Sequence, residues 1–254
     1  MIIEMVMQSS FQLIDMFWVG KLGAEAIAAV SMSGIILMVM FSLAIGVSIA
    51  NNALISRRVG EENFSQAGDV LVQAALISIV ITAVCAWIGW RSAGHFLALL
   101  GAKGEVLSLG RGYLKISFLG CGAVIFLFVI NAAYRGAGHA AEAMTFLIIA
   151  NTINILIDPC LIFGWAFFPR MGINGAAYGT IFSQLIAVSF QIYWLFKGKL
   201  KIVFDRIRIR GKILAVMLAI SIPGAFQILL RIMATLIIMK LVSAYGTYAI
   251  AAYG

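Results

Sequence analysis

The chain has 254 residues, of which 63% are hydrophobic and only 11% charged, and its mean hydropathy is +1.06. So few charges cannot cover the surface of a water-soluble domain of this length, so we exclude that class and expect lipid to solvate much of the surface. The net charge of +8 does not indicate nucleic-acid binding, because seven of the 18 basic residues fall in KGKLKIVFDRIRIRGK, residues 197–212, between two apolar stretches.

Six long apolar stretches follow one another along the chain, and each reaches or exceeds the ~20 residues that a helix needs to cross the hydrocarbon of a bilayer. They are continuous rather than alternating, which favours membrane-spanning helices over barrel strands. The stretches are 26–56, 67–90, 112–134, 143–168, 175–196 and 213–242. Together with the apolar segment before Gly20, they predict seven crossings and an all-α, polytopic transmembrane helix bundle.

The loops between these stretches differ in basic content, which predicts their orientation. One alternating set holds ten Lys and Arg residues and comprises 57–66, 135–142 and 197–212. The other set holds five and comprises 20–25, 91–111 and 167–174. Because basic loops stay on the cytoplasmic side, the first set and the N-terminus are expected there. We therefore expect a multi-pass protein of the plasma (bacterial inner) membrane.

Two distant segments of the sequence resemble each other. Residues 13–31 and 236–254 align without gaps, at an offset of 223 residues, and share the pattern Gly-x-x-Ala-Ile-Ala-Ala. Six crossings separate them, so both copies have the same orientation, which is typical of a parallel repeat. We therefore expect a first six-helix lobe over 1–197, a basic cytoplasmic loop over 198–212, and the first helix of a second lobe over 213–254. The rest of that C-terminal lobe would follow in the full chain.

Polar residues inside the predicted spans are the candidates for function, because an ionisable group there costs ~2.5–3.5 kcal/mol. Asp15 and Asp158 lie on two spans of the same direction and at similar depth. Asn151 and Asn154 precede Asp158 by seven and four residues, which places all three on one helix face. Pro159 frees a backbone carbonyl nearby. This group could bind and release H⁺, or hold Na⁺ at Asp15, Asn154 and Asp158. Alternatively, Asp158 and Asn154 join helices by hydrogen bonds alone.

Other chemistry finds little support in the sequence. Arg231 lies within the last span, where it could line a cavity or extend towards the interface. The three cysteines lack CxxC spacing and the two histidines lie apart in loops, so we expect no metal centre and no cofactor. The chain contains no HExxH and no DDxxD motif, which disfavours an enzyme.

Five segments carry a resemblance to the multidrug and toxic compound extrusion (MATE) family of transporters. They are DMFWVGKLGAEAIAAVS (15–31), GVSIANNALISRRVGEEN (46–63), YRGAGHA (134–140), NTINILIDPCLIFG (151–164) and MGINGAAYGTIFSQ (171–184). The chain resembles the family's N-terminal lobe plus the start of the second lobe. The resemblance implies a twelve-helix antiporter that alternates access between the two sides of the membrane. Its substrates would be organic cations or drugs, exported against H⁺ or Na⁺.

The resemblance also implies roles for particular residues. The family's cation-site aspartate of the first helix matches Asp15, and its fifth-helix asparagine and aspartate match Asn154 and Asp158. The chain departs from the family in the loop after YRGAG, where the family usually has an acidic residue and a proline and this sequence has His139 and Ala143 nearby instead. A lipid-linked oligosaccharide flippase of the same superfamily is the alternative. The substrate and the choice between H⁺ and Na⁺ stay open.

Overall fold

The computed structural model describes residues 13–165, 168–198, 200, 202 and 209–243, with side chains as far as residue 234. Residues 13–20 form the first described helix. The helices that follow are α2 (Ala24–Gly60), α3 (Phe64–Leu99), α4 (Gly104–Leu119), α5 (Cys121–Gly136), α6 (Ala140–Phe163), α7 (Ile173–Phe196) and α8 (Gly211–Ser243). The described residues contain no strand, so the predicted all-α fold is confirmed.

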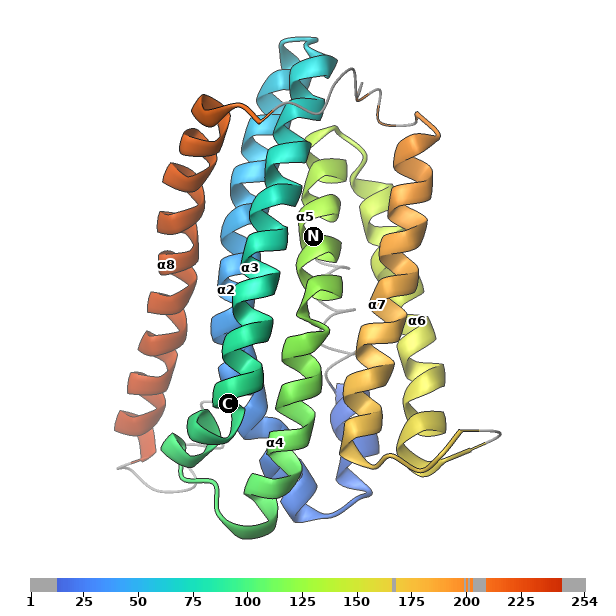
Figure 1. Ribbon diagram of the computed structural model, residues 1–254, viewed down its shortest axis with the longest axis vertical. Coiled ribbons are helices and arrows are strands. Elements are labelled where there is room, and N and C mark those ends of the chain that lie inside the picture. Colours follow the sequence, from blue (N-terminus) through green and yellow to red (C-terminus); the bar gives the residue numbers. More distant parts are fainter. Residues whose placement is uncertain (1–12, 166–167, 199, 201, 203–208, 244–254) are drawn as a thin grey trace.

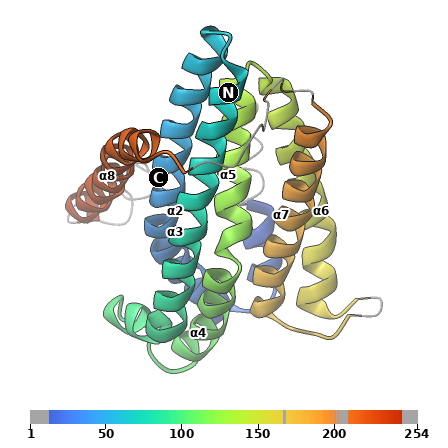
Figure 2. The ribbon, with the colours of Figure 1, turned by 45° about the horizontal axis from the view of Figure 1, so that its top comes forward.

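The helices lie side by side as a bundle, and α8 packs along α2 at one side of it (Figures 1 and 2). Five of them are long and apolar enough to cross a membrane, and α4 with α5 forms a sixth span that is bent by 46°. Six predicted crossings are thus found at their predicted places. The first crossing begins at residues 1–12, outside the described part of the chain. Residues 244–254, which carry most of the predicted repeat, also lie outside it, so the parallel repeat stays a prediction.

The predicted span 112–134 differs from the structure in one respect. It is two helices that meet at Gly120, and the first of them begins at Gly104 rather than near residue 112. Helix α7 comes close at this point, since a methyl group added at Gly120 would overlap the side chain of Ile181. The sequence shows only an apolar run, because hydropathy does not record a bend that depends on a neighbouring helix.

The turn between α2 and α3 is shorter than the predicted loop 57–66. Helix α2 continues to Gly60 because Arg57 and Arg58 bind Glu61 at 2.9 and 2.7 Å. Their hydrogen bonds hold the pKa of the Glu61 carboxyl below its usual range. Asn63 then starts α3, where its side-chain oxygen accepts a hydrogen bond from the amide of Gln66 at 3.1 Å.

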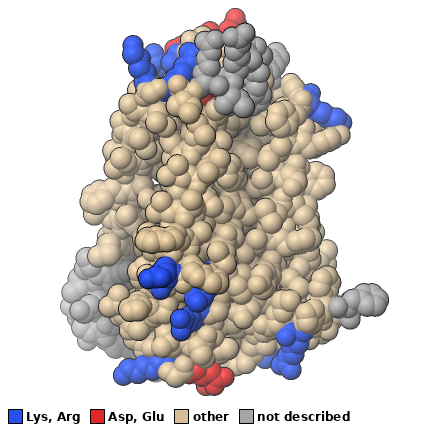
Figure 3. Space-filling view, viewed as in Figure 1, with Lys and Arg blue, Asp and Glu red and all other residues tan. Residues whose placement is uncertain are grey.

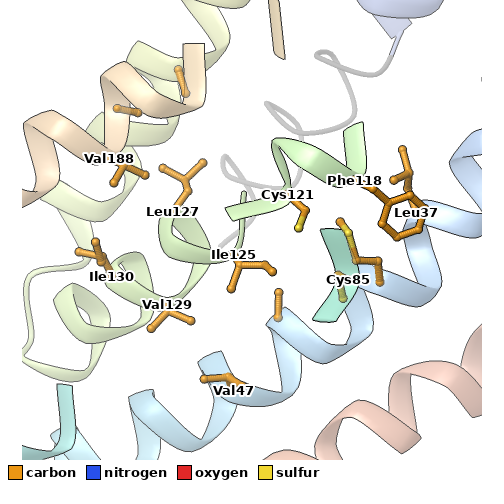
Figure 4. Close-up of a cluster of buried hydrophobic side chains, with 14 of the residues drawn as sticks. Leu37, Val47, Cys85, Phe118, Cys121, Ile125, Leu127, Val129, Ile130 and Val188 are labelled. Carbon is orange, nitrogen blue, oxygen red and sulfur yellow. The ribbon is translucent and has the colours of Figure 1, made fainter. Parts of the chain in front are cut away.

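The interior is packed by small and branched apolar side chains from every helix of the six-span bundle. Figure 4 shows one part, in which Val47 of α2, Cys85 of α3, Phe118 of α4, Ile125 of α5 and Val188 of α7 lie around a common centre. Cys85 and Cys121 are buried thiols in this cluster. The core thus joins the helices that position the candidate site.

On the face seen in Figure 3, the middle of the surface is apolar and the charged side chains lie towards the two ends. We name the two ends of the bundle after residues in their turns. The Glu61 end has the turns at Glu61–Asn63 and Gly138, and the Gly101 end has the turns at Leu100–Lys103 and Gly164. Many large apolar residues between the ends are exposed, among them Val80, Leu156 and Ile222 at 62%, 64% and 65%. Lipid covers such a surface, as expected of a multi-pass membrane protein.

Candidate cation site and adjoining cavity

Two of the predicted polar residues of α6 form one unit in the structure. Asn154 and Asp158 are both only 1% exposed, although they lie in an apolar helix. The Asn154 amide donates a hydrogen bond from Nδ2 to Oδ1 of Asp158 at 2.8 Å. Their four-residue spacing puts them on one helix face, so the amide fixes the direction of the carboxyl group.

The first described helix brings a second carboxyl group to this unit. The side chain of Asp15 lies next to that of Asp158, close enough for the two carboxyl groups to interact electrostatically. Two ionised carboxylates in contact repel each other, so this arrangement favours a proton or a cation between them. Oδ1 of Asp15 and Oδ2 of Asp158 are buried and have no hydrogen-bond partner among the described residues. The pair can therefore take up a proton, or a cation that the free oxygens would bind.

Helix α7 closes the other side of Asp158 through residues that the sequence analysis did not select. A methyl group added at Gly179 would overlap Oδ1 of Asp158, and one added at Gly175 would lie 2.6 Å from the carbonyl carbon of Leu161. The Thr180 hydroxyl lies 3.5 Å from Nδ2 of Asn154. Two glycines four residues apart are a known pattern of close helix packing, so their spacing could have indicated this contact.

A cavity of about 440 Å³ adjoins the carboxyl pair. Its walls are mostly apolar and come from the first helix and from α2, α4, α5, α6 and α7. The lining includes one acidic side chain, methionines and aromatic rings: Asp15, Met16, Met38, Phe41, Tyr113 and Phe128. Among the described residues of its lining, Asp15 is the one carboxylate, and none is Lys, Arg or His.

The other predicted site residues fall in different places. Asn151 lines the cavity, one turn from Asn154. Pro159 is buried, and α6 continues through it to Phe163. Arg231 is exposed on α8 and is not among the residues that line the cavity. The structure thus brings Asp15, Asn154 and Asp158 together, with Asn151 beside them, and leaves Arg231 outside.

Comparisons with known proteins agree with one another. The family model described as MatE matches residues 1–160. The chain is 32% identical over 247 residues to the FAD transporter of Shewanella oneidensis, which covers 96% of this chain and 54% of that protein. It is 28% identical over 260 residues to the probable multidrug resistance protein YoeA of Bacillus subtilis, which covers 100% of this chain and 56% of that protein.

Solved structures show the same relationship. A multidrug resistance MATE family transporter in an outward-facing conformation superposes with a TM-score of 0.87 at 28% identity, over 95% of this chain and 53% of that one. The chain spans about half the length of the curated relatives it matches. The family match covers more than half of this chain, from Met1 past Asp158. The chain belongs to the MatE family of multidrug and toxic compound extrusion proteins.

Proposed function

We propose that the full-length protein is a secondary active efflux transporter that exports organic cations or drugs in exchange for H⁺ or Na⁺. It would alternate access between the two sides of the plasma membrane, with its N-terminus in the cytoplasm. The observation that carries this proposal is the pair of neighbouring carboxyl groups, Asp15 and Asp158, with Asp15 in the cavity wall. A second lobe, beginning at residue 213 after the basic loop 198–212, would complete the cleft around it.

Coupling follows from the proximity of the two carboxyl groups. Two neighbouring carboxylates repel each other when both are ionised unless a cation lies between them, so the loaded state would hold one proton or one Na⁺. Release of that cation to the cytoplasm would leave negative charge at the cavity wall, because Asp15 is one of the lining residues. A substrate that enters from the cytoplasm would meet this charge. A cationic substrate and the coupling cation would then compete for the same carboxyl pair, which is how exchange is enforced.

The cavity supports a cationic or neutral amphiphile as the substrate. Methionine side chains adapt to ligands of different shape, and aromatic faces attract cations. Met16, Met38 and Met40 supply the first property, and Phe41, Tyr113 and Phe128 the second. The Shewanella relative is named as a transporter of FAD, an anionic dinucleotide, but the described lining of this cavity offers no basic side chain to a phosphate.

The lipid-linked oligosaccharide flippase considered above is not favoured. Such a carrier must bind a pyrophosphate headgroup, which calls for basic side chains in the cleft. Arg231, the basic residue that the sequence places within the last span, is not part of the cavity wall. Two relatives are named as multidrug proteins, which agrees with drug efflux.

The experiment that tests the proposal replaces Asp158 by Asn in the full-length protein. This change keeps the shape of the side chain and its contact with Asn154 but removes the titrating group. Efflux of an organic cation such as ethidium is measured from vesicles under an imposed pH or Na⁺ gradient. We expect gradient-driven efflux to fall to the level of empty vesicles, while ethidium still binds in detergent, because Asp15 and the aromatic side chains of the cavity wall are unchanged.

The matched control is Glu105→Gln, which neutralises an exposed carboxylate of α4 at the Gly101 end. This variant should keep the wild-type rate. Wild-type efflux by Asp158→Asn under both gradients would show that Asp158 only joins helices. A response to one gradient alone, in the wild type, identifies the coupling cation.

A further inference from the structure

Three basic side chains lie on the exposed face of α3 and α4 near the Gly101 end, on spans rather than in a loop. They are Arg91 of α3 and Arg111 and Lys115 of α4. Arg111 and Lys115 are four residues apart and so share one face of their helix. Lys115 reaches across to α3, where its Nζ lies 4.7 Å from the ring centre of Trp90. Arg111 lies against α3 as well, since a methyl group added at Gly94 would be 3.5 Å from its Cδ.

Their surroundings are those of a membrane interface. Trp87 and Trp90 are 71% and 52% exposed, which is high for tryptophan unless lipid covers them. Tryptophan gathers where the hydrocarbon meets the headgroups. Figure 3 shows basic surface within the apolar face over the lower parts of α3 and α4, apart from the charges at the tip of the Gly101 end. The three cations therefore lie at the level of the lipid headgroups.

Within the part of the chain that the structure describes, no carboxylate forms an ion pair with Arg91, Arg111 or Lys115. Ion pairs are found at the other end, where Arg57 and Arg58 bind Glu61, His139 binds Glu142 and Arg210 binds Asp69. Two like charges four residues apart on a helix repel each other. An anion placed between Arg111 and Lys115 would remove that repulsion and gain strength from the low dielectric of the interface.

We infer that the surface formed by Arg91, Arg111, Lys115 and Trp90 binds the phosphate headgroup of an anionic phospholipid in the leaflet at the Gly101 end. A guanidinium matches two phosphate oxygens at once, and the ammonium of Lys115 is already held in place by the Trp90 ring. The acyl chains would lie along the exposed ring of Trp87 and the apolar surface beyond it. None of these four residues lines the cavity, so the lipid site is separate from the proposed transport site.

Native mass spectrometry of the delipidated full-length protein tests this inference. Phosphatidylglycerol or phosphatidylcholine is titrated in, and the dissociation constant of the first bound lipid is measured. We expect the wild type to prefer phosphatidylglycerol. The Arg111→Gln/Lys115→Gln variant should bind it more weakly by about fivefold per removed charge, with phosphatidylcholine binding unchanged. Glycerol 3-phosphate in solution should not compete, because it lacks the acyl chains.

The control is Lys103→Gln/Arg170→Gln, which removes the same charge from the loops of the same end. It should keep the preference for phosphatidylglycerol. The inference is wrong if the wild type shows no preference between the two lipids, or if both double variants lose affinity equally, which would indicate a general effect of net charge. Equal competition by glycerol 3-phosphate would also overturn it, because the site would then bind free phosphate. These measurements do not depend on transport.

Discussion

Asp158 is held by uncharged residues of its own helix, α6, and of the neighbouring helix α7. The Asn154 amide directs one of its oxygens, and Gly179 of α7 leaves room for that same oxygen. Spacing along α6 predicted the first contact, because residues four apart on a helix are neighbours. It could not predict the second, since which glycine faces which carboxyl depends on how α6 and α7 pack. The same holds for Thr180, which completes the polar group from α7.

Replacing Gly179 by Ala should therefore disturb the site although it changes one methyl group. The new Cβ would overlap Oδ1 of Asp158, so the carboxyl must turn away from Asn154 and Asp15. Added volume in a packed helix contact costs ~1–3 kcal/mol, which exceeds the ~1 kcal/mol that alanine gains over glycine in a helix. We expect a lower midpoint of thermal unfolding in detergent and loss of gradient-driven efflux.

Gly60→Ala is the matched control, because nothing lies within 4 Å of a methyl group at this helix position. It should be neutral or stabilising. If Gly179→Ala, like Gly60→Ala, lowers neither the midpoint of thermal unfolding nor gradient-driven efflux, the close contact with Asp158 contributes to neither stability nor transport.

At the scale of elements, hydropathy predicted where the spans lie but not how they end or bend. The run 112–134 is broken at Gly120, where α7 approaches, and most of the predicted loop 57–66 belongs to α2 and α3, which end and begin at the Glu61 ion pairs and the Asn63 cap. The placement of the first helix is a further example. Trp18 packs against Phe163 and Trp165 at 6.0 and 6.2 Å between ring centres, which fixes this helix against the end of α6.

Trp18 is one turn from Asp15, so this aromatic contact should set the position of the Asp15 carboxyl. In Trp18→Ala the first helix loses its packing on α6, and the two carboxyl groups should separate. We expect the concentration of coupling cation needed for half-maximal efflux to rise about tenfold or more. A tenfold rise corresponds to a loss of ~1.4 kcal/mol in cation binding, which is a modest share of the stabilisation that the aromatic contacts of Trp18 provide. Maximal efflux at saturating cation should fall less.

Trp18→Phe keeps an aromatic ring on Phe163 and should restore most of the cation affinity. A purely structural role would lower the amount of folded protein without changing the cation dependence. Equal cation affinity in the alanine variant and the wild type would exclude a positioning role for Trp18.

Helix α8 is joined to the six-span bundle by close packing on α2 and by an ion pair to α3. Helix α8 approaches α2 closely, since a methyl group added at Gly46 would lie 2.9 Å from Cβ of Ala225 and one added at Gly224 would lie 3.6 Å from Cα of Gly46. The segment before α8 is tied to α3 by an ion pair of 2.9 Å between Arg210 and Asp69. In the sequence Arg210 is one of seven basic residues in 197–212, so its partner could not be predicted from charge counts. If α8 begins the second lobe, as proposed, this pair fastens that lobe to the first one.

Replacing Asp69 and Arg210 one at a time tests this role of the ion pair, because the two changes should lower stability by different amounts. The Asp69 side chain is only 8% exposed, whereas that of Arg210 is 42% exposed. Arg210→Gln leaves a buried carboxylate without its cation, so it should lower the midpoint of thermal unfolding more than Asp69→Asn does, because the amide needs no counter-charge. The double variant should resemble Asp69→Asn. The coupling energy between the two changes should be about 1 kcal/mol, reduced by the exposure of Arg210, and should fall as salt is added.

The pair Arg57–Glu61 is a control at the same end, since its side chains are 70% and 41% exposed and its coupling should be near zero. Additive effects at Asp69 and Arg210 would show that the pair does not hold the segment before α8 against the bundle, and that the packing of α8 on Gly46 is sufficient.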